Sequence, residues 1–220
     1  KAAGDHEIDI AGARTMSEKL VATTGESQRD ILQLVQYADY DAYTVGHSVR
    51  VALLAVMVGR ALGMEQRWLT ELGTAGILHD VGKSKIPAEI LFKRARLDPD
   101  EQRVMAQHPC LGAQILFEND RVGPLAIGAA WGHHLRADRN GYPAMPAWAA
   151  RSRVTALVQV CDVYEALTAV RPYKPALPPR RVFEIMFADR GAFDTGALAA
   201  HVRTLGLYQP GSSVRHAASE

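Results

Sequence analysis

The sequence predicts an all-α protein with a single domain. Two observations support this fold class. Apolar residues recur at helical spacing in several segments, and no segment shows the strict alternation that is typical of a half-buried strand. The chain has 220 residues, of which 48% are hydrophobic and 22% are charged. This length is sufficient to bury one core, and the composition excludes a disordered, collagenous or mucin-like chain.

Helix signals follow one another from residue 31 onward. The segment 44–62 is apolar around its whole circumference, which predicts a helix at the centre of the domain that ends at Gly63. Another helix begins at Asp98 and continues to about residue 107, because Pro99 suits its first turn and Glu101 completes a capping box. The other expected helices are 31–38, 68–80, 109–117, 122–132, 152–168, 179–187 and 195–205, with loops at 139–146 and 171–179 where turn dipeptides and prolines gather.

The first 28 residues are polar, weakly patterned and interrupted by glycines. We therefore expect residues 1–28 to be a linker or the remnant of a signalling helix, and residues 29–220 to form the domain. The chain begins with Lys1 and has no signal peptide, so we interpret it as a fragment of a longer, cytoplasmic protein. Cys110 and Cys161 are then expected to be buried thiols.

Charge and hydropathy exclude two classes of partner. The net charge is +1, and no basic helix is interleaved with aromatic residues, so we expect no nucleic-acid partner. The longest apolar run, residues 51–59, is far shorter than the ~20 residues that span a bilayer, so we expect no membrane contact by this fragment.

Five histidines and two carboxylates stand in apolar or nearly apolar helical segments. They are His47, His79, Asp80, His108, His133, His134 and Asp162. Any one of these histidines alone is more simply interpreted as a core residue with satisfied hydrogen bonds. Together with carboxylates that are costly to bury without partners, they favour metal cations. A ligand set without thiolates suits iron or manganese better than zinc, and its size favours two ions with Asp80 as a candidate bridge.

Several motifs follow one another in a specific order. Residues 79–83 read His-Asp-Val-Gly-Lys, followed by His108-Pro109, the pair His133-His134, Gly-Tyr-Pro at 141–143 and Arg-Pro-Tyr at 171–173. In this order the motifs resemble the HD-GYP subgroup of the HD phosphohydrolase superfamily, and the similarity covers about residues 31–213.

The resemblance implies an HD-type helical bundle with a buried metal centre. It also implies a metal-dependent phosphodiesterase that hydrolyses cyclic di-GMP to pGpG or GMP. Carried over by motif, the metal ligands are His47, His79, Asp80, His108, His133, His134 and Asp162. Members that hold three metals place a Glu four residues before the first histidine. Tyr43 stands at that position here, which favours two divalent ions, most simply iron or manganese.

The resemblance also implies roles beyond metal binding. Asp80 and Lys83 would be catalytic, with Lys83 binding a non-bridging phosphate oxygen and offsetting charge in the transition state. Arg171 and Lys174 would hold the second phosphate, and Tyr142 would pack on a guanine or fix its loop. The Gly-Tyr-Pro loop is implied in contacts with diguanylate cyclase domains, and an upstream sensor or receiver domain is expected.

Four positions depart from the family pattern. Leu135 and Val170 each replace a carboxylate, Arg139 replaces a glycine, and Glu165 replaces an aspartate. Every expected ligand is retained, but two alternatives stay open. One is a catalytically weak module that binds metal or nucleotide and regulates through partner-domain contacts. The other is hydrolysis of a different cyclic dinucleotide or of a nucleotide phosphate. Asp138 is expected either to orient a ligand histidine or to lie in a surface loop.

Overall fold

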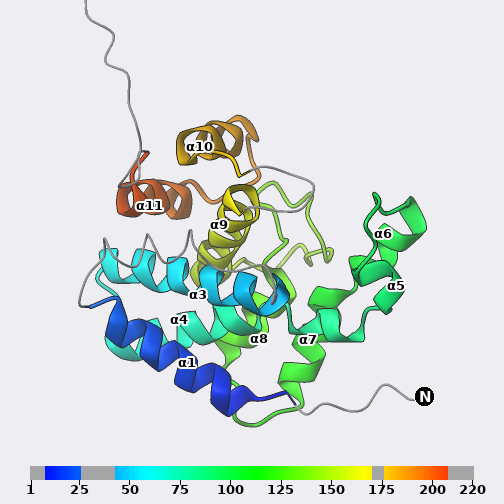
Figure 1. The fold of residues 1–220 in the computed structure, drawn as a ribbon, viewed down its shortest axis with the longest axis horizontal. Coiled ribbons are helices and arrows are strands. Elements are labelled where there is room, and N and C mark those ends of the chain that lie inside the picture. Colours follow the sequence, from blue (N-terminus) through cyan, green and yellow to red (C-terminus); the bar gives the residue numbers. More distant parts are fainter. Residues whose placement is uncertain (1–7, 26–42, 170–175, 208–220) are drawn as a thin grey trace, which may run out of the picture.

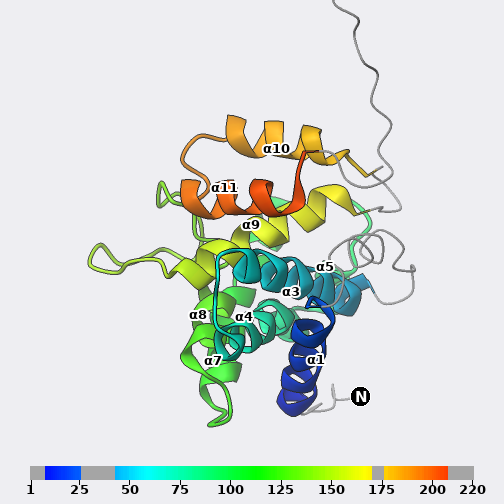
Figure 2. The same cartoon turned by 90° about the vertical axis from the view of Figure 1, so that its left-hand side faces the viewer.

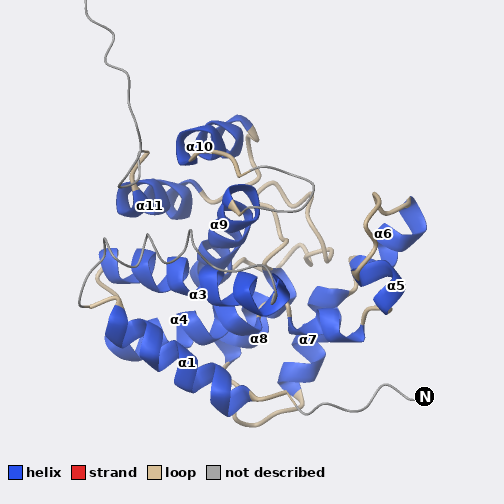
Figure 3. Cartoon of the chain, in the orientation of Figure 1, coloured by secondary structure: helices blue, strands red, loops and turns tan. Residues whose placement is uncertain are grey.

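The computed structural model is built from helices packed around one central helix (Figure 1). It describes residues 8–25, 43–169 and 176–207, with the backbone only at 43–45. Within those ranges Figure 3 contains helices and loops but no strand, which confirms the all-α prediction. The expected helix at 31–38 lies outside the described residues.

The central helix is α3, Tyr43–Ala61. Its residues from Val51 to Val58 are all buried, as the apolar sequence of this segment predicts. Helix α3 packs against α4 (Gln66–Leu78) and α9 (Arg153–Thr168), and α11 (Thr195–Leu205) lies over it in both views of the ribbon (Figures 1 and 2). This buried helix is the platform on which the other elements are arranged.

Helix α1, Ile10–Thr23, lies within the first 28 residues. Asp9 caps its first turn, and Ile10, Ala13 and Val21 are buried against the core. The buried Ser17 hydroxyl donates to the Thr70 carbonyl of α4 at 2.7 Å. Residues 10–23 therefore contribute to the core as a packed helix, while the domain boundary at residue 29 stays a prediction.

Helix α4 ends earlier than the sequence predicts. The expected helix 68–80 stops at Leu78, and a 3₁₀ turn, η2 (Val81–Lys85), follows directly. His79 and Asp80 therefore lie where the chain turns rather than inside a helix.

Close packing of η2 on α7 explains this turn. Helix α7 spans His108–Phe117, and a Cβ atom on Gly82 would lie 2.0 Å from the His108 carbonyl oxygen and 2.4 Å from the Gly112 nitrogen. No side chain fits at that distance, so Gly82 allows the two backbones to meet. This contact holds His108 beside His79 and Asp80.

The remaining helices complete the bundle. They are α5 (Ala88–Leu91), α6 (Pro99–Met105), α8 (Pro124–Gly132) and α10 (Pro179–Ala188). The capping box expected at Asp98 is present, with its side chain accepting from Glu101 N–H. The short helix α5 was not expected from the sequence.

The structure corrects the prediction that both cysteines are buried. Both thiols are free, but only Cys161 is buried, so the prediction that Cys110 is buried is wrong. Cys110 lies on the outer side of α7, because the inner side of this helix carries His108, Pro109 and Gly112. Within the described residues no helix combines the length and the apolar character needed to cross a membrane.

A first prediction tests the contact between η2 and α7. Substituting Gly82→Ala should reduce the free energy of unfolding by about 2–3 kcal/mol, since the new methyl group overlaps backbone atoms that have no room to move. Urea denaturation measures this loss. Gly128→Ala is the control, because its Cβ would lie 4.0 Å from the nearest atom, Thr155 Oγ1, and it should be neutral or stabilising. Equal stabilities of the two variants would contradict the packing argument.

A second prediction concerns the buried His201 on α11. Burial lowers the pKa of His201 to about 3, and its Nε2 atom has no hydrogen-bond partner. Between pH 6.5 and 3 the unfolded chain therefore binds a proton that the folded chain does not bind. Stability is fully present above pH 6.5 and is lost as the pH falls, by about 2 kcal/mol at pH 5.

The substitution His201→Phe removes this titration while keeping a ring beside Tyr164, whose centroid lies 4.6 Å from that of His201. Urea denaturation of the metal-free proteins measures the free energy of unfolding at pH 7.5 and at pH 5. The decrease between these pH values should be smaller in the variant than in the unaltered protein by about 2 kcal/mol. The contributions of all other ionisable groups are common to both proteins and cancel in the difference. The same drop in both proteins would show that His201 is not the group responsible.

Candidate metal centre

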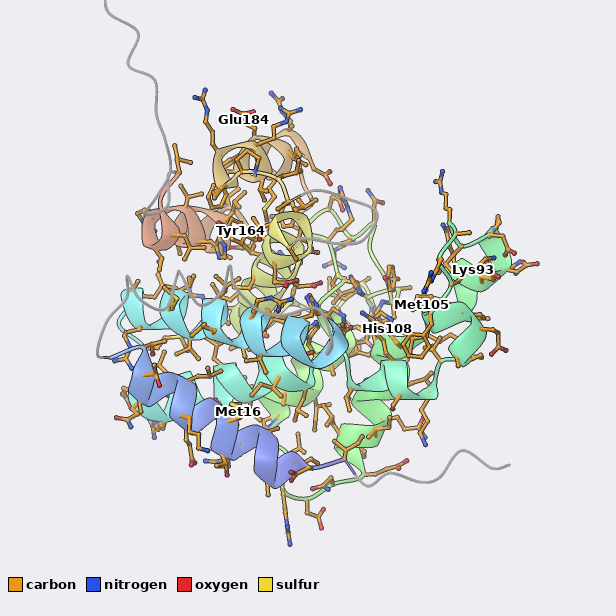
Figure 4. All side chains as sticks on the ribbon, viewed as in Figure 1. Met16, Lys93, Met105, His108, Tyr164 and Glu184 are labelled. Atoms are coloured by element: carbon orange, nitrogen blue, oxygen red, sulfur yellow. The ribbon has the colours of Figure 1, made fainter. Side chains whose placement is uncertain are left out.

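The structure brings all seven expected ligands together from five parts of the chain. His47 comes from α3, and His79 and Asp80 come from the turn after α4. His108 begins α7, His133 and His134 follow α8, and Asp162 lies on α9. Figure 4 places His108 in the middle of the molecule, beside Met105. Three overlapping groups have ligand atoms within 4.8 Å of one another: His47-His79-Asp80, His108-His133-His134 and His79-His133-Asp162.

Asp80 belongs to the first of these groups and also faces the second. Its Oδ2 atom is 3.4 Å from His79 Nε2 and 3.7 Å from His47 Nε2. Its Oδ1 atom is 3.3 Å from His108 Nε2 and 3.5 Å from His133 Nε2. Each carboxylate oxygen thus faces a different pair of imidazoles, which is the arrangement that a bridging carboxylate requires.

Main-chain carbonyls orient three of the imidazoles. His79 Nδ1 lies 2.7 Å from the Gly76 oxygen, and His108 Nδ1 lies 2.8 Å from the Met105 oxygen. His133 Nδ1 is 3.1 and 3.0 Å from the oxygens of residues 129 and 130. A carbonyl only accepts, so each Nδ1 carries a proton, and Nε2 is the nitrogen that each ring directs toward the centre.

In the neutral tautomer that metal ligation requires, these nitrogens and the Asp80 oxygens are all acceptors, yet they converge. His108 Nε2 and His133 Nε2 are only 3.1 Å apart, and both face Asp80 Oδ1. The buried atoms His79 Nε2 and Asp80 Oδ1 have no hydrogen-bond partner. Converging lone pairs repel one another unless a cation lies between them, so this donor set fits divalent metal ions.

Both aspartates of the site are ionised. Burial opposes the charged form of Asp80, but protons on the imidazoles of His79, His108 and His133, which a bound cation would replace, lower its pKa well below the usual range. The pKa of Asp162 is likewise lowered, against the effect of its burial, by the hydrogen bond from His47 and by nearby imidazoles. The centre therefore concentrates negative charge away from water, which strengthens its attraction for cations.

Glu165 and Arg50 form a second layer that the sequence argument missed. Glu165 is buried on α9; its Oε2 atom makes a short contact with His47 Nδ1, and its Oε1 atom accepts from Arg50 Nε at 2.6 Å. Sequence reasoning treated Glu165 only as a mild departure from a motif. Its spacing of three residues after Asp162 is the signal that places both carboxylates on one face of a helix.

His47 differs from the other histidines because carboxylates face both of its ring nitrogens. Its Nε2 atom lies 3.1 Å from Asp162 Oδ1, while Nδ1 contacts Glu165. Burial disfavours the charged ring, yet the hydrogen bonds to these carboxylates raise the pKa of His47 to about 9. A metal ion bound at Nε2 would displace a proton from this ring, so metal binding should release protons.

His134 and Tyr142 lie at the half-buried side of the centre. Their ring centroids are 4.6 Å apart with an interplanar angle of 32°. Burial lowers the pKa of His134 to about 2. His134 is thus neutral at physiological pH, as a metal ligand must be, and Tyr142 covers one face of its ring.

The other expected site residues have varied surroundings. Lys83 Nζ donates to Asp80 Oδ2 at 2.5 Å, so this lysine reaches the centre from its rim. Arg171, Lys174 and Val170 lie outside the described residues, as does the side chain of Tyr43.

The loop after His134 contains two of the departures from the family pattern. Asp138 touches no ligand histidine; the Arg136 guanidinium and the Asn140 N–H bond it and lower its pKa to about 2, which leaves the surface-loop interpretation. Arg139 adopts a φ of 67°, in the left-handed region where glycine is preferred, and its guanidinium reaches three loop carbonyls at 3.3–3.4 Å.

Comparisons with known proteins agree with this geometry. A family model described as an HD domain matches residues 23–196. The cyclic di-GMP phosphodiesterase PA4108 of Pseudomonas aeruginosa is 34% identical over 94% of this chain and 50% of its own length. The cyclic di-GMP phosphodiesterase response regulator RpfG of Xanthomonas campestris is 32% identical over 87% of this chain and 52% of its own.

A third relative and two solved structures extend the comparison. The 3'3'-cGAMP-specific phosphodiesterase 3 of Vibrio cholerae is 34% identical over 75% of this chain and 36% of its own length. The chain therefore spans about half or less of these curated relatives. Bd1817, an HDG"Y"P protein from Bdellovibrio bacteriovorus, shares the fold with a TM-score of 0.71 at 15% identity, over 87% of this chain and 62% of its own. The PgpH HD domain of L. monocytogenes shares the fold with a TM-score of 0.56 at 18% identity, over 73% of this chain and 88% of its own.

A third prediction concerns the second layer. Glu165→Gln keeps an acceptor but removes the charge that orients His47, so it should weaken Mn²⁺ binding about 10–100-fold, as measured by equilibrium dialysis. Glu184→Gln is the matched control, since Glu184 lies at the outer surface of α10, paired with Arg180 and Arg181 (Figure 4). If both variants bind Mn²⁺ as tightly as the unaltered protein, Glu165 does not support the centre.

Proposed function

The chain belongs to the HD domain family, and on this basis we propose that it is a metal-dependent phosphodiesterase that hydrolyses cyclic di-GMP. The products would be pGpG, GMP or both. The reaction would take place at a centre of two divalent ions, most simply iron or manganese, held by His47, His79, Asp80, His108, His133, His134 and Asp162.

One observation supports this proposal above the others. The Nε2 atoms of His79, His108 and His133 converge on the two oxygens of Asp80 in a buried space. As neutral ligands these nitrogens are all acceptors, which suits cations between them and Asp80, and their division between the two Asp80 oxygens suits a binuclear centre.

Residues around the centre would bind the substrate and neutralise its charge. When bound, two divalent ions supply activated water and neutralise charge on a phosphoryl group. Lys83 is placed to bind a non-bridging phosphate oxygen next to Asp80. Tyr142 and His134 would border the substrate pocket, and Arg171 and Lys174 would hold the second phosphate. Water adds to phosphorus as the bond to the 3′ oxygen breaks, and that oxygen leaves with a proton.

The names of the relatives support cyclic dinucleotides as the substrate class. Three that are at least 32% identical to the chain are named phosphodiesterases, two for cyclic di-GMP and one for 3'3'-cGAMP. Cyclic di-GMP is the substrate we propose, and 3'3'-cGAMP is the competing one. Both carry two phosphates in a ring, so the metal centre alone does not discriminate between them.

The second candidate function is a regulatory module that retains metal or nucleotide but hydrolyses it weakly. Leu135 favours it, because a buried leucine follows the histidine pair at a position where the family usually has a carboxylate. Tight binding of cyclic di-GMP without product would select this candidate.

Partner domains and location form the last part of the proposal. The segment between α8 and α9 projects from the body (Figure 2), and Trp148 on it is 88% exposed. This loop would meet diguanylate cyclase domains, and an upstream sensor or receiver domain would regulate the centre. A cytoplasmic location fits such partners, with both cysteines as free thiols.

A fourth prediction tests the proposed activity. Protein purified without oxygen and loaded with ferrous iron or manganese should contain two ions and convert cyclic di-GMP to pGpG or GMP faster than 3'3'-cGAMP. Lys83→Met should lower kcat about 10²–10³-fold, because charge on the transferred phosphoryl group loses a cation. Lys93→Met is the matched control, since Lys93 pairs with Glu101 on a separate part of the surface. Bound metal is counted by mass spectrometry, and products by chromatography.

Three different results would contradict separate parts of the proposed function. Replacing both His79 and Asp80 with Ala should abolish turnover, and unchanged turnover in that double variant would refute a reaction at this centre. Two bound ions with intact cyclic di-GMP would favour the regulatory module. Faster turnover of 3'3'-cGAMP would keep the reaction and change the substrate.

A further inference from the structure

His134 is supported differently from the other four histidines of the centre. Carbonyl oxygens or Glu165 hold the Nδ1 atoms of His47, His79, His108 and His133. Within the described residues, neither ring nitrogen of His134 has a hydrogen-bond partner. Its position must therefore come from its own main chain and from contact with the Tyr142 ring. The main-chain N–H of Tyr142 also donates to the His134 carbonyl at 3.3 Å.

Arg151 contacts this main chain directly. Its Nη1 atom donates to the carbonyl oxygen of Leu135, the residue after His134, at 2.7 Å. The same nitrogen donates to Gln159 Oε1 at 2.5 Å. Arg151 is half-buried, and the Leu135 side chain is buried, so the carbonyl is the polar group that Leu135 offers to its surroundings.

Gln159 provides a firm anchor for this contact. It is 4% exposed on α9, three residues before Asp162, and its Nε2 atom donates to the Ala192 carbonyl at 3.3 Å. The Ala192 carbonyl also accepts from Ala137 N–H at 3.0 Å. The guanidinium of Arg151 therefore links the turn that carries His134 to the helix that carries Asp162.

From these contacts we propose that Arg151 is a positioning residue for His134, acting through the carbonyl of Leu135 and anchored by Gln159. It sets the distance between His134 and the rest of its group, His108 and His133, without itself touching metal or substrate. The proposal rests on the proposed function only in assuming that this group holds one of the two ions.

The test uses Arg151→Met, which keeps a long unbranched side chain but removes the donors. Arg153→Met is the matched control, because Arg153 is exposed at the start of α9 and makes no hydrogen bond within the described part of the chain. Titration with Mn²⁺ should resolve two classes of site. We expect Arg151→Met to weaken one class about 10–100-fold and leave the other unchanged, while Arg153→Met changes neither.

Hydrogen exchange of the metal-free proteins gives a second readout that needs no activity. The segment 133–142 should exchange faster in Arg151→Met than in Arg153→Met, since the Tyr142 amide is bonded to the His134 carbonyl. Arg151→Lys should restore part of the protection, because one donor reaches the Leu135 oxygen. If Arg151→Met fails to fold, Gln159→Met tests the same link from its other end.

The outcomes separate this proposal from the proposed function. Equal exchange and equal Mn²⁺ isotherms in Arg151→Met and Arg153→Met would overturn the positioning role, as would equal weakening of both classes of site. If the unaltered protein hydrolyses no cyclic dinucleotide, the proposed function fails while these comparisons still decide the role of Arg151. In the double variant Arg151→Met/Gln159→Met, the loss should match that of Arg151→Met alone, since the two residues form one link.

Discussion

The buried carboxylate of Asp80 is the constraint on which the rest of the structure depends. An ionised group in the interior is stable only when positive charge or hydrogen-bond donors surround it. Lys83 donates to one oxygen of Asp80, and imidazoles at α4, α7 and α8 surround the carboxylate with their Nε2 atoms. The fold therefore assembles a buried charge that Lys83 meets at Oδ2 only, and divalent cations are the partners that complete the centre.

Backbone packing makes this assembly possible. Gly82 allows η2 to touch α7, and a Cβ on Gly76 would lie 2.6 Å from Ala52 Cα, so α4 meets α3 equally closely. These contacts place the ends of three helices around one point. Carbonyls near the ends of α4, α6 and α8 hold Nδ1 of His79, His108 and His133, so main-chain geometry also sets the orientation of these imidazoles. Helix ends, rather than dedicated polar side chains, thus orient most of the centre.

Sequence reasoning succeeded where local signals suffice and failed where they do not. Apolar patterning predicted α3, and the capping box at Asp98 predicted the start of α6. The motif order identified seven residues that the structure brings together. The end of α4 at Leu78 was missed, because the contact of Gly82 with α7 is a tertiary one. The links of Glu165 to Arg50 and of Arg151 to Gln159 were missed for the same reason: each partner is an ordinary polar residue until the fold is known.

The departures from the family pattern bear on catalysis more than on metal retention. Leu135 removes a carboxylate beside the histidine pair, yet its main-chain carbonyl still receives a charged donor from Arg151. Arg139 occupies a backbone conformation suited to glycine, and its guanidinium bonds the loop that this conformation shapes. In both places a positive side chain acts on main-chain oxygens where the family uses a carboxylate or a glycine. Support of this kind keeps ligands in place but offers no acidic group to a substrate. If the proposed function holds, the residues that would retain metal and those that would tune turnover are therefore separable in this chain, and activity could vary while the centre persists.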